Sequence, residues 1–318
     1  MLKISKGKVA RPLRVVIAGV EGIGKSTFAS QFPDPLFIDL EKGTDSMDVA
    51  RTQLPENWDE MIQITKDIVA DPSVCKTLVV DTGDWAEHLC ESHVCTKQHV
   101  NGIEDIGYGK GYTYLRETFA DFLKALDNVI DAGVNVVMCC HTQIKKFELP
   151  DEQGAYDRYE LKLSKQVAPL VREWCDIQLF ANFKTYVVST ENNKNHHKGT
   201  GGTKRVMYAS HTASWDAKNR HGLPDEMEFS FKSIAHLFDT ASQPKREEKS
   251  PLEQVRDLLA KDDVTELELM AVVAQKGKYP SNTPIEQYEP TFLTAWVIKY
   301  WNDIVPLARK IREGMNNG

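Results

Sequence analysis

Short apolar runs alternate with longer amphipathic stretches along the first 240 residues of the chain. Unbroken apolar runs of this kind are typical of strands that a parallel sheet buries on both faces. They cover residues 13–18, 36–38, 77–80 and 134–140. Between the last two, residues 85–94 and 115–132 carry apolar side chains at helical spacing. The alternation predicts an α/β fold, with a mostly parallel sheet flanked by helices.

Further apolar runs follow in the next part of the chain. They cover residues 177–180, 186–188, 205–209 and 227–231, and a polar stretch over 190–203 separates the second run from the third. The runs predict an antiparallel edge on the same sheet. The polar stretch, which is rich in glycine and asparagine, predicts a loop.

The character of the sequence changes at residues 241–250, which are polar and contain no large apolar side chain. Such a segment predicts a linker. Beyond it, Ser250 and Glu253 form a capping-box pattern, and Thr265 and Glu268 repeat it. An apolar stripe between residues 293 and 311 predicts one last helix. The predicted organisation is an α/β domain over residues 1–240, a linker over 241–250 and a helical domain over 251–318.

Composition narrows the class of protein. The 318 residues are 41% hydrophobic, which allows a full core, and the formal net charge of −7 argues against coating nucleic acid by bulk charge. The six cysteines lie mostly in apolar segments, so we expect buried thiols in a reducing compartment. No apolar run approaches the roughly 20 residues that span a bilayer, so we expect no membrane role and a cytoplasmic location.

The first predicted strand runs directly into the sequence GVEGIGKST, which has the spacing of a Walker A phosphate-binding loop between a strand and a helix. Glycines let successive backbone N–H groups face phosphate oxygens, and the following helix adds its positive end. Lys25 is predicted to reach the β and γ phosphates of ATP, and Ser26 to offer its hydroxyl to Mg²⁺. The predicted nucleotide-binding residues are Gly19, Gly22, Ile23, Gly24, Lys25, Ser26 and Thr27.

An apolar strand that ends in an acid follows at Thr77 to Asp81, which is the Walker B pattern. Asp81 is therefore the second predicted magnesium-side residue, beside Ser26. Hydrolysis also requires a group that orients or deprotonates the attacking water. Two acids compete for that role, Glu41 at the end of the second strand and Asp84 just past Walker B.

Sulfur and imidazole side chains also crowd one short stretch, at His88, Cys90, His93, Cys95 and His99. A zinc site would draw on the same residue types. On a helix, however, Cys95 shares a face with His88 and His99, while the other two lie elsewhere. The spacing favours buried thiols and surface histidines over a zinc site.

The stretch Phe37-Ile38-Asp39-Leu40-Glu41 resembles the strand end of RecA recombinases, in which the glutamate is catalytic. The resemblance assigns that role to Glu41 and leaves Asp84 as a loop acid. After the fourth strand, RecA-like proteins place a polar γ-phosphate sensor. Either His141 or Gln143 occupies that position in this chain.

The segment Lys218-Asn219-Arg220 resembles the lysine–asparagine–arginine segments of RadA, the DnaB helicases and KaiC. In those relatives the two cations reach the nucleotide of a neighbouring subunit. The resemblance therefore implies that Lys218 and Arg220 act in trans and that the active form is a homo-oligomer.

Taken together, residues 11–238 most resemble the RecA-like ATPases of the phage single-strand annealing and recombination type, the phage nucleotide-binding protein family. The segment Tyr108-Gly109-Lys110-Gly111-Tyr112 and residues 162–182 add to the likeness. The resemblance implies a RecA-like P-loop core, ATP and Mg²⁺ as cofactors, and the cytoplasm of a host cell if a phage encodes the chain.

Single-strand binding requires cations along a groove and aromatic faces on which bases stack. Three segments have such residues. The tyrosine segment is equally compatible with packing at a helix start, and the basic segment with a solvated turn. The candidates are Tyr108, Lys110 and Tyr112, then Lys145 and Lys146, then the basic residues Lys194, His196, His197, Lys198, Lys204 and Arg205.

The leading functional hypothesis is an ATP-hydrolysing recombination protein that acts on single-stranded DNA by annealing or strand exchange. The alternative is a nucleotide-gated helicase loader or regulatory ATPase that acts on a protein partner. A small-molecule kinase is disfavoured, because such enzymes bring arginines from a lid and this chain has a subunit-shared basic segment instead. The helical domain is expected to contact a partner, such as a single-strand binding protein or a replication protein, because it follows a linker.

Overall fold

A computed structural model describes residues 7, 11–148, 154–190, 193–238 and 250–316 of the chain, without the side chains of 186–200 and 313–316. The chain divides into two compact units, Met1–Gln243 and Pro244–Gly318. The first unit contains the phosphate loop, and each unit has a hydrophobic core of its own.

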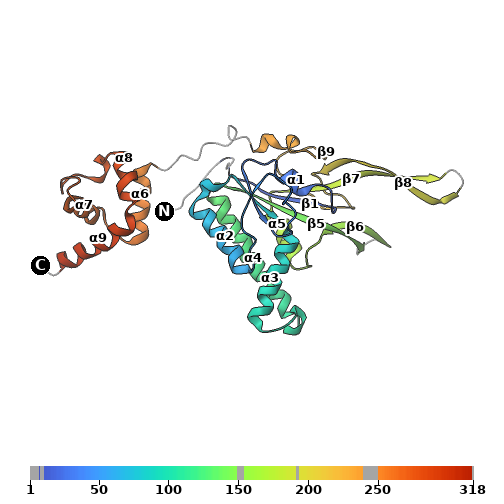
Figure 1. Cartoon of the computed structure of the whole chain (residues 1–318), viewed down its shortest axis with the longest axis horizontal. Helices are drawn as coiled ribbons and strands as arrows, with labels where there is room; N and C mark the ends of the chain where they lie inside the picture. The colour runs from blue at the N-terminus through green and yellow to red at the C-terminus, as the bar shows by residue number, and fades with distance from the viewer. Residues whose placement is uncertain (1–6, 8–10, 149–153, 191–192, 239–249, 317–318) are drawn as a thin grey trace. The chain divides into compact units, whose positions relative to one another are not determined.

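The described part of unit 1 is built on a nine-stranded sheet (Figure 1). Its central strands pair in parallel from β3 to β7, and β8 and β9 pair antiparallel at one side, as the sequence predicts. Strand β6 (Ala155–Leu161) lies off this path and pairs antiparallel with β5. In spatial order the sheet runs β3 (Ala50–Arg51), β2 (Pro35–Asp39), β4 (Thr77–Asp81), β5 (Asn135–Glu148), β1 (Arg14–Gly19), β7 (Ile177–Thr190), β8 (Asn193–Tyr208) and β9 (Glu226–Glu228).

Helices cover both faces of the sheet. One face packs against α2 (Trp58–Ala70), α3 (Gly83–Gln98), α4 (Lys110–Asp131) and α5 (Val167–Trp174), and the other against α1 (Lys25–Ala29) and the short turns η3 (Phe231–Ser233) and η4 (Ala235–Leu237). Short turns η1 (Pro72–Val74) and η2 (Ile103–Ile106) precede β4 and α4. On β1, Val16 and Ala18 enter the first core and Val15 and Ile17 the second, because side chains alternate along a strand. This two-sided burial explains the unbroken apolar run.

Several predicted boundaries change in the structure. The two runs after residue 176 form one long strand, β7, and the predicted loop over 190–203 is wrong, because residues 193–203 continue β8 and pair with β7. Strand β5 also runs past its apolar segment to Glu148. Strand β5 is extended by backbone hydrogen bonds to β6, and β8 by backbone hydrogen bonds to β7. These bonds continue each strand through residues whose side chains are not apolar. Helices α2 and α5 and strand β6 were not among the predicted elements.

An ion-pair cluster fixes the start of β1 against the start of β7. Asp176 is 4% exposed and accepts hydrogen bonds from Arg11 (2.7 Å) and from the guanidinium and backbone N–H of Arg14. Burial pushes the pKa of Asp176 upward, but the bonds from Arg14 outweigh it and hold this pKa below its ordinary value. The carboxylate therefore stabilises the central strands in its charged form.

Unit 2 is helical. The predicted capping boxes are confirmed: Ser250 accepts from the backbone of Glu253, and Thr265 from that of Glu268. The predicted single last helix is wrong, because Leu293–Ile298 forms a π-helical segment before a separate α9. The elements are α6 (Pro251–Asp262), α7 (Glu266–Gln275), η5 (Ile285–Gln287), α8 (Pro290–Phe292), the π segment and α9 (Trp301–Asn316).

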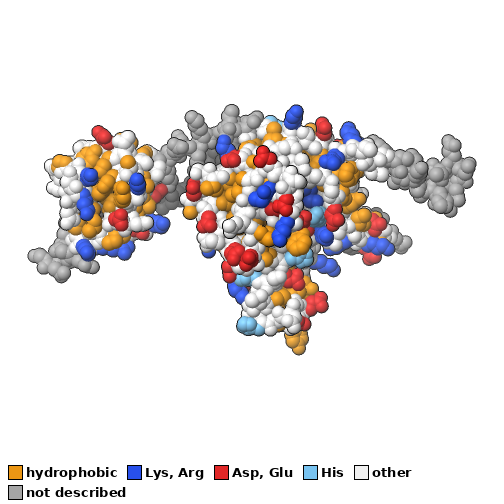
Figure 2. Space-filling model, viewed as in Figure 1, with side chains coloured by type: hydrophobic (Ala, Val, Ile, Leu, Met, Phe, Trp, Pro, Cys, Tyr) orange, Lys and Arg blue, Asp and Glu red, His pale blue; other side chains and the backbone are white. Residues whose placement is uncertain are grey.

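Charges of both signs are interspersed on the face of unit 1 that Figure 2 shows, in keeping with a mildly acidic protein. The six cysteines are free and buried, as expected. Among the described residues, no helix has the length and the apolar character needed to cross a bilayer.

Candidate nucleotide-binding and catalytic site

The phosphate loop connects β1 to α1 at the carboxyl end of the sheet. Gly22 and Gly24 have φ values of 72° and 99°, a left-handed region that side chains disfavour. Gly19 is required for a different reason: a Cβ on it would lie 2.8 Å from the carbonyl oxygen of Ala181 on β7. The glycines therefore serve both the turn and the close packing of strand ends.

Lys25 is only 6% exposed, and its ammonium group donates to the carbonyl oxygens of Gly19 (3.4 Å) and Val20 (3.3 Å). The side chain thus folds back over its own loop. Bonds of this length are weak, so phosphate oxygens can replace them at little cost.

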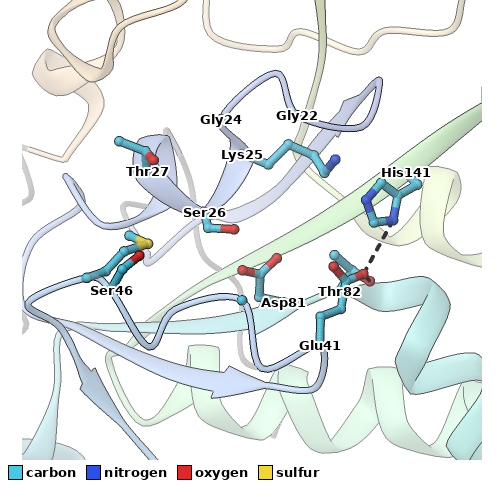
Figure 3. Close-up of a pocket in the computed structure, with 12 residues that line it drawn as sticks. Gly22, Gly24, Lys25, Ser26, Thr27, Glu41, Ser46, Asp81, Thr82 and His141 are labelled. Carbon is cyan, nitrogen blue, oxygen red and sulfur yellow. Dashed lines mark hydrogen bonds and ion pairs between the residues drawn. The ribbon is translucent and has the colours of Figure 1, made fainter.

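A cavity of about 300 Å³ opens beside this loop (Figure 3). The phosphate loop forms one wall, and the ends of β2 and β4 supply the acids of the other, with the imidazole from the middle of β5. The lining residues are Gly22, Gly24, Lys25, Ser26, Thr27, Glu41, Gly43, Ser46, Met47, Asp81, Thr82 and His141.

Ser26 and Asp81 both line the cavity, and their side chains lie near each other (Figure 3). Burial raises the pKa of Asp81, Ser26 opposes that rise, and the nearby carboxylates of Glu41 and Asp39 add to it. A buried carboxylate next to other acids and a hydroxyl is a set of hard oxygen donors that fits Mg²⁺. Ser26 and Asp81 are the residues that would hold the ion.

His141, in the middle of β5, contacts two acids. Its backbone N–H donates to Asp84 Oδ1 (3.1 Å), and its Nδ1 lies 2.8 Å from Asp84 Oδ2 and 3.4 Å from Glu41 Oε1. Thr82 Oγ1 donates to the same oxygen of Glu41 (2.7 Å). Since both acids face Nδ1, this nitrogen carries a proton and the ring orientation is fixed.

Asp84 differs from its expected place as a loop acid. It lies in the first turn of α3, is 4% exposed and does not line the cavity. Burial pushes the pKa of Asp84 upward, but the hydrogen bonds from His141 outweigh it, so the pKa is lowered. Asp84 therefore orients His141 without lining the cavity, whereas Glu41 lines the cavity.

The two sensor candidates are separated by the structure. His141 lines the cavity, whereas the Gln143 side chain donates to the carbonyl oxygen of Leu161 on β6 (3.3 Å). Gln143 is thus engaged in the β5–β6 pair, which leaves His141 as the group placed to contact a phosphate.

Lys218 and Arg220 lie away from the phosphate loop of their own chain. Lys218 forms an antiparallel β-bridge with Gln178 on β7, and Gln178 lies beside Val16 of β1. Val16 comes three residues before the end of β1, where the phosphate loop begins. Its ammonium donates to the carbonyl oxygens of Arg172 and Glu173, both at 2.9 Å, and so binds the end of α5. Arg220 is exposed.

Two parts of the site were not predicted. Thr82 follows Asp81 and orients Glu41, and residues 43–47 form a loop on the cavity wall. Asp39 shapes this loop by accepting from the backbone N–H of Gly43 (3.1 Å) and the hydroxyl of Thr44 (2.6 Å). The Asp-x-x-x-Gly-Thr spacing after a strand was the available signal, since aspartate commonly caps such turns.

The predicted DNA candidates are dispersed. Tyr108 is fully exposed at the turn before α4, while the Tyr112 hydroxyl donates to Glu104 (3.1 Å). Lys145 and Lys146 lie on β5. The side chains of Lys194, His196, His197 and Lys198 fall outside the described residues.

Residues 11–221 match the family model described as an AAA domain, AAA_24. This chain belongs to that AAA domain family. The match covers the phosphate loop, Asp81 and His141, so this AAA-domain protein is a P-loop ATPase with an α/β core.

The AAA-domain protein is also similar to two individual proteins. It is 22% identical over 131 residues to the SPbeta prophage-derived uncharacterized protein YorG of Bacillus subtilis (strain 168), and the match spans 40% of each chain. The KaiC-like protein PH0186 from Pyrococcus horikoshii OT3 is 16% identical, with a TM-score of 0.33 over 64% of this chain and 80% of that one.

Proposed function

We propose that this AAA-domain protein hydrolyses ATP with Mg²⁺ and couples hydrolysis to single-stranded DNA, in annealing or strand exchange. The observation that carries the proposal is strand β5, which leads from His141 in the nucleotide cavity directly to the cations Lys145 and Lys146. Four residues of strand span roughly 13 Å, so the two places are linked by one stiff element.

In the nucleotide cavity, the residues divide the work of hydrolysis. Lys25 and the loop backbone bind the phosphates, and Ser26 and Asp81 hold magnesium, whose charge stabilises the phosphate oxygens. Glu41 orients the attacking water or takes its proton, since of the two candidate acids, Glu41 and Asp84, it is the one that lines the cavity. His141, oriented by Asp84, contacts the terminal phosphate from the cavity wall.

A second cavity, of about 310 Å³, supports the DNA-binding part of the proposal. It lies between β5, β6 and the start of α5, and its wall carries four cations, Lys145, Lys146, Lys165 and Arg172, against one acid, Glu160. Arg172 is already paired with Asp216 (2.7 Å), and Lys145 with Glu160 (3.9 Å). Among the described residues, Lys146 and Lys165 are the lysines of this wall that have no ion pair. A local excess of lysine suits the phosphodiester backbone even on an acidic protein.

The test is the steady-state rate of ATP hydrolysis with and without single-stranded DNA. We expect DNA to stimulate the rate, Lys25→Ala to abolish it, and Lys145→Ala with Lys146→Ala to remove only the stimulation. Lys66→Ala, an exposed lysine on α2, is the matched control and should behave as wild type. A rate that ignores DNA would contradict the coupling and favour a loader or regulator that acts on a protein.

A further inference from the structure

Arg205 on β8 contacts the phosphate loop of its own chain. A Cβ built on Gly24 would lie 3.0 Å from Nη1 of Arg205 and 4.0 Å from its Cζ. The guanidinium group therefore touches the last glycine before Lys25. Because Gly24 also lines the nucleotide cavity, Arg205 stands at the rim of that cavity.

The sheet fixes where this side chain begins. Arg205 pairs with Phe183 of β7, and its Cζ lies 6.0 Å from the centre of the Phe183 ring. The next two residues of β8, Val206 and Met207, are 1% and 0% exposed and anchor the strand in the core. Stacking on an aromatic ring orients a guanidinium while leaving its N–H donors available.

Arg205 also differs from other arginines of unit 1 in its partners. Arg11 and Arg14 pair with Asp176, and Arg158 and Arg172 pair with Asp216. Among the described residues, no carboxylate lies at ion-pair distance from Arg205. Its charge is thus available to an anion, and the nearest site built for anions is the phosphate loop.

We infer that Arg205 binds the phosphate chain of the nucleotide in cis. The inference rests on the proposed nucleotide site and adds a cation that no sequence motif indicates. Guanidinium groups suit phosphate because their donors form paired hydrogen bonds to two oxygens. With Lys25 on one side of the loop and Arg205 at its rim, two cations face the phosphates from the same chain. Lys218 and Arg220 by contrast lie away from the loop.

The experiment measures the dissociation constants of ATP, ADP and tripolyphosphate, each with Mg²⁺, by titration calorimetry. Arg205→Ala should weaken all three by about 10- to 100-fold, the usual effect of losing one charged hydrogen-bonding partner. Arg205→Lys should fall between Arg205→Ala and wild type. Lys204→Ala is the matched control: it removes the same charge from the adjacent exposed position of β8 and should leave binding within about twofold.

Equal binding by folded Arg205→Ala and wild type would overturn the inference, as would a loss of DNA binding without any loss of nucleotide binding. Thermal denaturation checks folding, and Arg205→Lys serves if the alanine variant does not fold. If the wild-type protein itself binds no ATP, the result contradicts the proposed ATPase function as well as the role of Arg205. Mixing Arg205→Ala with Lys25→Ala should restore no hydrolysis, because a cis residue cannot complement a neighbouring site.

Discussion

At the scale of single residues, chemistry in this site depends on small differences in placement. Glu41 and Asp84 both contact Nδ1 of His141, yet only Glu41 lines the cavity. Asp84 accepts two hydrogen bonds from His141 and is nearly inaccessible. In the proposed mechanism the two acids therefore have different roles: Glu41 acts on the attacking water, and Asp84 orients the imidazole.

Glu41→Gln should lower kcat by about 100- to 10,000-fold, because the amide cannot accept the proton of water. Asp84→Asn should lower kcat less, by about 10- to 100-fold, through a less well-oriented His141. Dissociation constants for ATP should change by less than about threefold in both. Rapid-quench kinetics and nucleotide titration check this order, and a larger loss in Asp84→Asn would reverse the two roles.

At the scale of elements, β1 is the strand on which the site depends. It lies between β5 and β7, and its end forms the phosphate loop. Two features hold it: alternating side chains that fill both cores, and the cluster of Arg11 and Arg14 on Asp176 at its start. The opposite end of the strand is closed by Gly19 against Ala181.

Asp176→Asn should lower the free energy of unfolding by about 2 to 3 kcal/mol at neutral pH, because it leaves two arginines without their carboxylate. The pKa of Asp176 is lowered in the folded state, from an ordinary value of 3.8. Its stabilisation is therefore complete above that value and is lost as pH falls below it. Denaturant unfolding at several pH values should show the variant and wild type converging in acid.

The exposed Asp121→Asn is the matched control for that experiment. Its carboxylate pairs with Lys124 at the surface of α4, with side-chain exposures of 72% and 75%. Pairs of this kind contribute little, so the change should stay within about 0.5 kcal/mol. A pH-independent loss in Asp176→Asn would point to packing instead of charge.

At the scale of the whole molecule, one chain brings acids, an imidazole and the ammonium of Lys25 to the cavity, whereas Arg220 is exposed and does not line it. The proposal that Arg220 acts on a neighbouring subunit makes assembly a condition for hydrolysis. Of the two predicted trans cations, Arg220 is the exposed one, since the Lys218 ammonium already binds the end of α5.

Arg220→Ala should reduce hydrolysis by about 1,000-fold or more while leaving ATP binding nearly unchanged, as expected for a cation that acts on the transition state. Mixing it with Lys25→Ala should restore part of the rate, because a shared site can take Lys25 from one chain and Arg220 from the other. Absence of restoration would place Arg220 outside the interface. Light scattering with and without ATP would report the assembly directly.

The sequence by itself determined the features that depend on neighbouring residues. Gly19 to Ser26, Asp81 and the capping boxes at Ser250 and Thr265 follow from short patterns, because turns, helix starts and buried strand ends are set locally. The alternation of apolar runs determined the α/β class for the same reason.

Only the tertiary structure decided which distant side chains meet. Asp84 and His141 are 57 positions apart, and Arg205 reaches Gly24 from β8, which β7 separates from β1 in the sheet. Such contacts depend on strand order and register, which short patterns do not encode. The long pairing of β7 with β8 is another case, because backbone hydrogen bonds extended a strand through a polar stretch that local propensity assigns to a loop.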